Sequence, residues 1–253
     1  MDLTRRAYIP EQIPSYMCSF SGLKWSNEGP FIYYYGEGEI RFIGYSLDEG
    51  DLEKSLQRAI DRHRPVRVLV ASPRKIEGYD VIESDEYYFL DAESLKINKK
   101  IRNLIKRAEK DVKVRETELE DEHLHFIRDF VRRKGLKEHE IMLRKLPEYV
   151  RAAKPLILEA RQEGRLIAVT IADIKSSDAF SFYLFNFTSE RKVPGASDLL
   201  LKNLIDRSIE MGKKVNMGLG INEGIRKFKL KWGAKILAPF YLMERYCQEI
   251  SLF

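Results

Sequence analysis

The sequence predicts an α/β protein in which strands and helices alternate along the chain. Segments rich in β-branched and aromatic residues alternate with amphipathic segments along the whole chain. Of its 253 residues, 44% are hydrophobic and 33% are charged, which is typical of a globular protein with its own core. From residue 112 onward the expected order is strand, two helices, hairpin, strand, helix, strand, helix and strand.

The first 90 residues predict a small α/β unit. Residues 1–26 contain two prolines and no clear period, so we expect an irregular lead-in with one short helix. The next expected elements are a hairpin over 31–35 and 39–45, a helix over 51–63, and extended segments over 66–71 and 79–90.

The remaining elements follow from the same two periodicities. Ala179–Thr188 is dense in strand-forming residues and predicts a central strand, with Phe182 and Leu184 on one face and Tyr183 on the other. Pro147 is expected to kink or end the helix that contains it. The other expected elements are helices over 96–110, around 124–134 and over 138–150, strands over 112–117 and 234–246, and a hairpin over 156–161 and 165–174.

Residues 191–233 predict a loop, a helix, a short strand, a glycine-rich turn and a second helix. Ser197 is the expected N-cap of the first helix, whose first turn carries an aspartate, and Gly212 is expected to end that helix. In the second helix, Trp232 is expected to face inward and Lys231 outward. The loop leaves backbone N–H groups at a helix N-terminus, an arrangement that suits an anionic ligand.

Three separated motifs resemble one family of enzymes. They are Arg102–Lys110 (R-N-L-I-K-R-A-E-K), Pro194-Gly195-Ala196, and Gly224–Gly233 (G-I-R-K-F-K-L-K-W-G). These motifs resemble the C-terminal part of GNAT-fold acyltransferases, especially the FemABX aminoacyltransferases and the C-terminal domain of phosphatidylglycerol lysyltransferases. The resemblance covers roughly Tyr87 to Met243 and leaves the first third of the chain uncovered.

The resemblance implies a GNAT-like mixed sheet, with a GNAT domain over residues 91–253. Residues 1–90 are then an N-terminal extension or a second, tandem GNAT-like half, although no sequence repeat supports a second half. Acyl transfer to an amine or a hydroxyl is implied, with aminoacyl-tRNA as the favoured donor. Many acetyl-CoA-dependent GNAT enzymes carry Q/R-x-x-G-x-G/A, whereas here Pro194 replaces the first glycine and removes one N–H donor.

Lys229 is the first candidate catalytic residue. It lies beside the inward stripe of its helix and can reach toward the preceding turn. The resemblance implies that it binds the donor or the developing oxyanion, and the alternative is an ordinary surface lysine. Tyr183 and Asn216 are candidates for orienting the amine or stabilising the oxyanion, and are otherwise plain sheet residues. The resemblance places donor binding at Arg191, Gly195, Ala196 and Ser197.

Residues 96–110 form the most basic segment of the chain. A stripe of apolar residues leaves the basic side chains on the rest of the helix surface, against a single glutamate. Such a face concentrates phosphate-bearing ligands such as tRNA, a nucleotide-sugar or a lipid head group. The alternative is a solvated helix face. The candidate phosphate-binding residues are Lys99, Arg102, Lys106 and Lys110.

Other classes of site are disfavoured by composition. Cys18, Cys247 and the four histidines have no zinc-ligand spacing, so no metal site is expected and a reducing compartment is favoured. No apolar run of about 18 residues occurs, which predicts a cytoplasmic protein with at most peripheral contact with anionic lipid. No tightly bound cofactor is expected, and the co-substrate is aminoacyl-tRNA or acyl-CoA.

Three functions stay open on the sequence. The first is aminoacyl transfer from tRNA, and the second is acetyl-CoA-dependent N-acetylation. The third is a GNAT-like module that has lost catalysis and only binds a phosphate-bearing ligand. It stays open because no pair of carboxylates stands out as a general acid and base.

Overall fold

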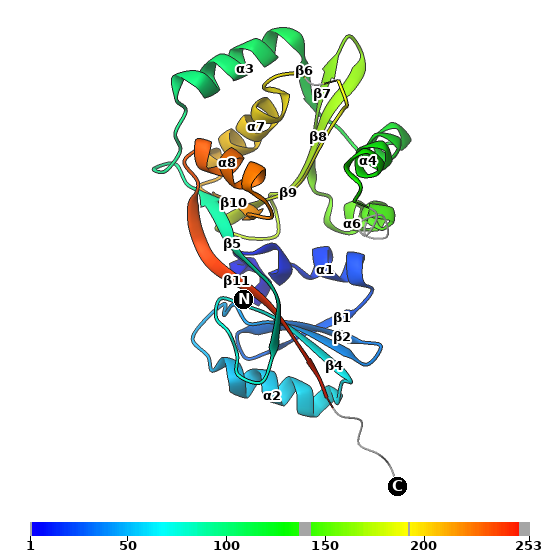
Figure 1. Ribbon diagram of the computed structural model, residues 1–253, viewed down its shortest axis with the longest axis vertical. Helices are drawn as coiled ribbons and strands as arrows, with labels where there is room; N and C mark the ends of the chain where they lie inside the picture. Colours follow the sequence, from blue (N-terminus) through cyan, green and yellow to red (C-terminus); the bar gives the residue numbers. More distant parts are fainter. Residues whose placement is uncertain (1, 137–142, 192, 248–253) are drawn as a thin grey trace.

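One mixed sheet of eleven strands runs through the residues that the structure describes (Figure 1). These are residues 2–136, 143–191 and 193–247 of a computed structural model. The strands are β1 (Lys24–Glu28), β2 (Phe31–Gly36), β3 (Glu39–Ile43), β4 (Arg67–Ser72), β5 (Asp80–Leu90), β6 (Lys113–Glu116), β7 (Leu156–Gln162), β8 (Arg165–Asp173), β9 (Phe180–Thr188), β10 (Lys214–Leu219) and β11 (Lys235–Tyr246). The α-helices are α1 (Pro14–Ser21), α2 (Leu52–His63), α3 (Lys99–Asp111), α4 (Asp121–Lys134), α6 (Leu146–Ala153), α7 (Ala196–Glu210) and α8 (Glu223–Lys231), preceded by the short 3-10 helices η1 (Leu3–Arg6) and η2 (Pro10–Gln12).

The same structural unit occurs twice in the sheet. The strands lie in the order β1-β2-β3-β4-β11-β5-β10-β9-β8-β7-β6. The neighbours β3–β4 and β9–β10 are parallel, and the other neighbouring pairs are antiparallel. Each parallel pair is connected through a helix, α2 or α7, as parallel neighbours require. A hairpin, a helix and a strand therefore recur as β2-β3-α2-β4 and β8-β9-α7-β10.

The two halves of the chain exchange strands. β5 follows the first unit in sequence but lies between β10 and β11 in the sheet. β11 follows the second unit in sequence but lies between β4 and β5. The predicted division at residue 90 coincides with the end of β5, yet the sheet continues across it. Residues of the first half therefore reach the surroundings of the second unit.

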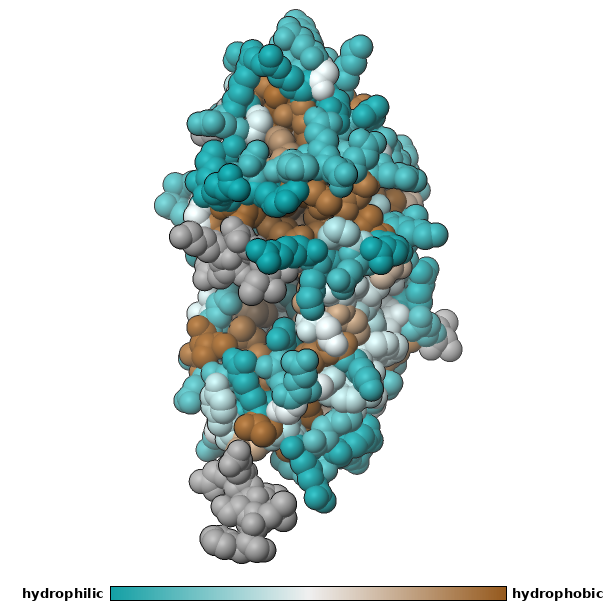
Figure 2. Space-filling model, turned by 90° about the vertical axis from the view of Figure 1, so that its right-hand side faces the viewer, coloured by the Kyte–Doolittle hydropathy of each residue, from teal (hydrophilic) through white to brown (hydrophobic). Residues whose placement is uncertain are grey.

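Helices cover both faces of the second unit. α3 and α7 pack on one face, where Ile105 and Leu200 belong to the same buried cluster. α1, α4 and α6 lie on the other face, where Ile127 and Tyr149 are buried (Figure 1). Figure 2 looks onto the side that carries α4 and α6, and shows apolar side chains gathered in a band across its upper half.

Most of the expected elements are present, with ends shifted by a few residues. Asp51 caps α2 by accepting a hydrogen bond from the Lys54 N–H at 3.1 Å, and Gly135 ends α4 at a φ of 69°. β9 is an interior strand, as predicted, because it pairs with both β8 and β10. β1 was not expected, because its sequence K-W-S-N-E lacks apolar alternation. The strand forms one edge of the sheet.

Two local predictions are wrong, whereas the break expected at Pro147 is present. Residues 143–144 are helical, the chain turns at Lys145 and α6 begins at Leu146, so Pro147 lies in the first turn of a new helix, where a proline needs no N–H partner. Residues 138–142 of the helix predicted there lie outside the described residues. Gly195, and not Ser197, is the N-cap of α7. Lys231 turns inward at the end of α8, where its amine lies 2.6 Å from Asp198.

β9 contains a bulge that changes which face its side chains cover. Ile171 pairs with Phe185 and Ala172 pairs with Tyr183, so Leu184 is an additional residue between them. Leu184 and Phe185 therefore both pack on the side of α1, α4 and α6, and Tyr183 packs with the cluster beneath α3 and α7. The predicted period of two holds only as far as this bulge.

Among the described residues, no helix is long and apolar enough to cross a membrane. In the same part of the chain, no group of three or more histidine, cysteine or carboxylate side chains is arranged to hold a metal ion.

Candidate functional site

The parallel strands β9 and β10 part after a short stretch of pairing. Their paired residues run only from Phe180 with Lys214 to Phe182 with Asn216. Beyond this point β10 has an irregularity between Asn216 and Gly218, and β9 has its bulge at Leu184. The first turn of α7 and the inner side of α8 supply the side chains that surround this point.

Lys229 is buried at this place. Its side chain projects from α8 toward the sheet, with 3% of the residue exposed, and its amine donates a hydrogen bond to the carbonyl oxygen of Leu219. The amine also lies 5.5 Å from the centre of the Tyr88 ring. Burial lowers the pKa of Lys229 to about 7, and the nearby carboxylate of Asp85 opposes this decrease. The interpretation of Lys229 as an ordinary surface lysine is therefore wrong.

Tyr183 lies on the same side of the sheet as Lys229. A Cβ atom at Gly218 would be 3.9 Å from the Lys229 amine and equally far from the carbonyl oxygen of Tyr183, so both residues border the irregular part of β10. Burial raises the pKa of the Tyr183 hydroxyl, and the negative charge of Asp198 raises it further. Tyr183 is therefore a neutral hydrogen-bonding group at neutral pH.

Asn216 points to the opposite face of the sheet. Its amide donates to the carbonyl oxygen of Tyr8 at 2.7 Å, and its side-chain oxygen accepts from the Gly218 N–H at 2.7 Å. The structure thus separates Asn216 from Lys229 and Tyr183. Its contacts hold the N-terminal segment on β10 and satisfy the backbone of the irregular turn that Lys229 approaches.

The predicted donor loop is closely packed by α3. A Cβ at Gly195, whose φ is 86°, would clash with the carbonyl oxygen of Leu104, so only glycine fits there. Ala196 is buried in the core, and Ser197 accepts a hydrogen bond from the Asn186 amide at 3.1 Å. Arg191 is exposed at the other end of the loop, and Lys192 lies outside the described residues.

The first turn of α7 already holds a negative charge. Asp198 accepts hydrogen bonds there from the indole of Trp232 at 2.9 Å and from the Lys231 amine at 2.6 Å. A carboxylate in the first turn interacts favourably with the helix dipole and occupies the place that an anionic ligand would take. Asp198 and its two partners were not among the predicted site residues, and the F-K-x-x-W-G motif is the signal that could have indicated them.

The basic residues of α3 form one exposed face. Ile101, Ile105 and Ala108 are buried against the core, which turns the charged side chains toward solvent. Within the described part of the chain, only Arg107 of this face has an ion-pair partner, Asp111 at 3.9 Å. The basic face comprises Lys99, Lys100, Arg102, Lys106, Arg107 and Lys110. The helix itself packs against the start of α7, where Leu104 and Ala108 cover Gly195.

The corresponding place in the first unit lacks these features. β3 and β4 stay paired over five residues, from Glu39–Arg67 to Ile43–Ala71. The loop that leads into α2 carries three acidic residues, of which Asp51 caps the helix. A Cβ at Gly50 in this loop would clash with Pro30. An anion is therefore disfavoured at α2, and the candidate site belongs to the second unit.

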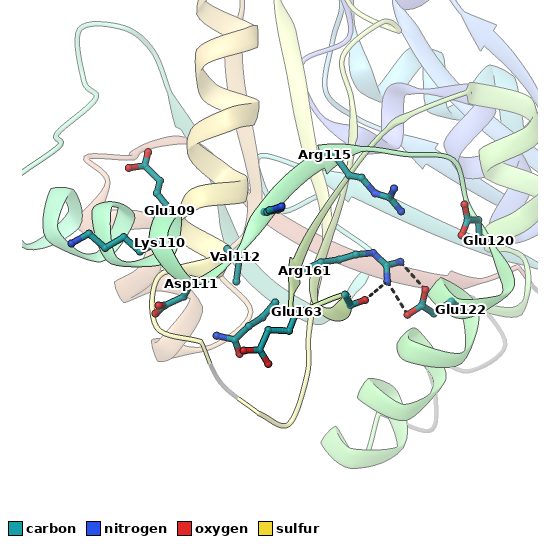
Figure 3. A pocket seen from close by; sticks show the side chains of 12 residues that line it. Glu109, Lys110, Asp111, Val112, Arg115, Glu120, Glu122, Arg161 and Glu163 are labelled. Atoms are coloured by element: carbon teal, nitrogen blue, oxygen red, sulfur yellow. Dashed lines mark hydrogen bonds and ion pairs between the residues drawn. The ribbon is translucent and has the colours of Figure 1, made fainter.

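A hollow lies away from Lys229, between the end of α3, β6 and the β7–β8 turn (Figure 3). Its volume is about 910 Å³, and acidic and basic side chains alternate along its walls. Beneath it, Glu159 is fully buried and binds His123 at 2.9 Å and Arg161 at 2.7 Å. Burial alone would raise the pKa of Glu159, but bonds from Arg161, Arg115 and His123 outweigh burial and lower it to about 2. These internal pairs hold β6, β7 and α4 together.

Comparison with known proteins identifies the fold. No family model matches the chain. No curated protein matches it in sequence. Among solved structures, the C-terminal domain of a putative lysylphosphatidylglycerol synthetase from Agrobacterium fabrum is similar, with a TM-score of 0.71 and 14% identity over 97% of this chain and 90% of that one.

Two further solved structures are similar to this chain. L-PGS from Bacillus licheniformis has a TM-score of 0.62 and 17% identity, covering 94% of this chain and 88% of that one. A tandem GNAT protein from the clavulanic acid biosynthesis pathway has a TM-score of 0.55 and 10% identity, covering 85% and 78%. The GNAT-like mixed sheet predicted from the three motifs is therefore confirmed, as is the similarity to the lysylphosphatidylglycerol synthetase group.

Proposed function

We propose that this protein is a GNAT-type acyltransferase that moves an aminoacyl group from aminoacyl-tRNA to an amine or hydroxyl acceptor. The observation that carries the transferase proposal is the buried amine of Lys229 at the point where β9 and β10 part. Burying a lysine amine costs free energy, and proteins keep such a group chiefly where its altered proton affinity has a use.

The amine suits the chemistry of acyl transfer. The acceptor attacks the carbonyl carbon of the donor ester, negative charge develops on the carbonyl oxygen, and the tRNA hydroxyl leaves as the acceptor loses a proton. With a pKa of about 7, both forms of Lys229 are populated at neutral pH. The protonated form donates to the developing oxyanion, and the low dielectric around it strengthens this interaction.

Three features of α7 favour aminoacyl-tRNA over acyl-CoA as the donor. Pro194 has no N–H to offer a pyrophosphate, Gly195 is covered by α3, and Asp198 places a negative charge in the first turn. A pyrophosphate would meet fewer free N–H donors there, and Asp198, paired with Lys231, already occupies the first turn of the helix. The phosphates of tRNA have a better partner in the exposed basic face of α3.

A module that binds a phosphate-bearing ligand without catalysis is the second candidate. The observation that favours it is the state of Asp198, the carboxylate whose charge raises the pKa of Tyr183. Asp198 is tied to Lys231 and Trp232 and is therefore poorly placed to accept a proton. In this case the α3 face would bind its ligand, and no transfer would occur with or without Lys229.

Transfer of a labelled amino acid tests the proposal. The protein is incubated with tRNA charged with labelled amino acids and with panels of phospholipid vesicles, peptides and amino sugars, beside an acetyl-CoA reaction. We expect label to move from tRNA to one acceptor class, and we expect Lys229→Met to slow this movement strongly. Acetyl transfer without aminoacyl transfer would overturn the proposed donor, and tight tRNA binding without any transfer would favour the binding module.

A further inference from the structure

A buried carboxylate from the first half of the chain closes the turn above Lys229. Asp85 lies on β5, the strand that inserts beside β10, and its side chain is only 4% exposed. It accepts hydrogen bonds from the Ile221 N–H at 2.5 Å, the Glu86 N–H at 2.8 Å and the Arg226 guanidinium at 2.9 Å. Burial alone would raise the pKa of Asp85, but these hydrogen bonds outweigh burial and lower it, so the group is ionised at neutral pH.

The turn over residues 218–222 has a conformation that its own sequence does not favour. Ile221 is β-branched and has a φ of 54°, a left-handed conformation that such residues rarely adopt. Its side chain gains little from burial, since 69% of the residue is exposed. A Cβ at Gly220 would lie 2.6 Å from both Arg226 Nε and Asp85 Oδ1. The turn is therefore held by its contacts with Asp85 and α8.

The same turn holds the amine of Lys229. The carbonyl oxygen that accepts the hydrogen bond from Lys229 belongs to Leu219, two residues before Ile221. Arg226 and Lys229 lie one turn apart on α8, so Asp85 is tied both to the turn and to the helix that carries the lysine. Movement of the turn or of α8 would therefore move the Lys229 amine relative to β9.

We propose that Asp85 is a positioning residue for Lys229, because it locks the 218–222 turn against α8 and thereby fixes where the amine lies. The effect on transfer rests on the proposed function, whereas the lock itself exists in the free protein. Asp85 would act on the donor only through Lys229, at the point where the exchanged strand β5 meets the second unit.

The charged and titratable groups around Lys229 come from four elements. β5 contributes Asp85, Glu86 and Tyr88, whose hydroxyl donates to Glu86 at 2.9 Å. The other groups are Arg226 on α8, Tyr183 on β9 and Asp198 on α7. Asp85 is the carboxylate whose negative charge supports protonation of Lys229. Its removal should therefore lower the pKa of the lysine as well as loosen the turn.

Two measurements on the unliganded protein test the lock. Asp85→Asn keeps the shape of the side chain but leaves Arg226 without its counter-charge, and Asp80→Asn on the exposed part of the same strand is the matched control. In hydrogen exchange, we expect the protection factor of the Ile221 amide to fall at least tenfold in Asp85→Asn. The protection factor of the Ile225 amide, which donates to Asn222, should change less. The pH dependence of Lys229 modification by an amine-selective reagent should shift to lower pH.

The outcomes separate this proposal from the proposed function. Unchanged exchange at Ile221 and unchanged modification of Lys229 in Asp85→Asn would overturn the lock, whatever the activity. Loss of protection in Asp85→Asn together with full transfer activity in Lys229→Met would keep the lock and overturn the function. If Asp85→Asn does not fold, Arg226→Gln removes one of the ties, and normal Ile221 protection together with normal Lys229 titration in that variant would also overturn the proposal.

Discussion

Trp232 and Asp198 join the end of α8 to the first turn of α7, through a hydrogen bond of 2.9 Å from the indole Nε1 to the carboxylate. Trp232 is completely buried, and a Cβ at the following Gly233 would clash with the carbonyl oxygen of Ser94. The W-G end of the G-I-R-K-F-K-L-K-W-G motif is therefore an anchor. It holds α8 in the orientation that keeps Lys229 beneath Leu219.

Trp232→Phe and Trp232→Ala should separate the two roles of the indole. Trp232→Ala opens a cavity in the core and should lower the free energy of unfolding by about 3–5 kcal/mol. Trp232→Phe keeps most of the packing but removes the hydrogen bond to Asp198, with an expected loss of about 1–3 kcal/mol. Urea denaturation measures both changes. An unchanged stability of Trp232→Phe would show that the hydrogen bond does not matter, and equal losses in the two variants would show that the cavity adds nothing to the loss of this bond.

Lys229→Met should reduce transfer while the fold stays intact. Methionine retains an unbranched side chain and good helix propensity but cannot donate to an oxyanion. We expect the rate of aminoacyl transfer to fall roughly a hundredfold or more, as when one oxyanion donor is removed elsewhere. Single-turnover kinetics with charged tRNA measure the chemical step. A variant with normal rate and normal donor binding would remove Lys229 from the site.

The stability of the protein should carry a pH dependence that belongs to Lys229. Its pKa is about 7 in the folded protein, against an ordinary value of 10.5 in the unfolded chain. Between these values the unfolded chain binds the extra proton, so stability rises with pH from 7 to 10.5 and falls as the pH is lowered toward 7. The slope is at most about 1.4 kcal/mol per pH unit. The difference between wild type and Lys229→Met in urea denaturation, compared at several pH values, should show this slope.

Charge reversal on the basic face of α3 should weaken the binding of polyanions. Lys99→Glu with Lys106→Glu changes the face while the buried stripe of α3 stays intact. Arg128→Glu with Lys134→Glu on α4 makes the same change in net charge on another helix and is the control. We expect only the α3 pair to reduce tRNA binding and to flatten its dependence on salt concentration. Equal effects of the two pairs would indicate a general charge effect.

The two faces of β9 should respond differently to substitution. Phe182 is completely buried, and Phe182→Asp should destabilise the fold by several kcal/mol, because it buries a charge without a partner. Tyr183→Phe removes only a hydroxyl on the α7 side and should leave the fold intact. Thermal denaturation compares the two variants. Similar losses of stability would contradict the arrangement of side chains before the bulge.

Local features of this protein were predictable from sequence because they depend on short-range physics. The apolar stripes of α2 and α3 and the strand formers of β9 each lie within one element, where periodicity acts. The basic face of α3 and the position of Lys229 beside an inward stripe followed in the same way. Errors arose where a residue had an alternative partner, as when Lys231 turned toward Asp198.

The tertiary structure alone decided how the candidate site is assembled. The exchange of β5 and β11 brings Asp85 to Ile221 across 136 positions of the chain, and no local pattern encodes such a contact. The sequence placed Lys229 beside the inward stripe of its helix and left a surface position open. Its burial, its hydrogen bond to Leu219 and its pKa of about 7 come from the strands that pack around it, because desolvation depends on everything that excludes water from the amine.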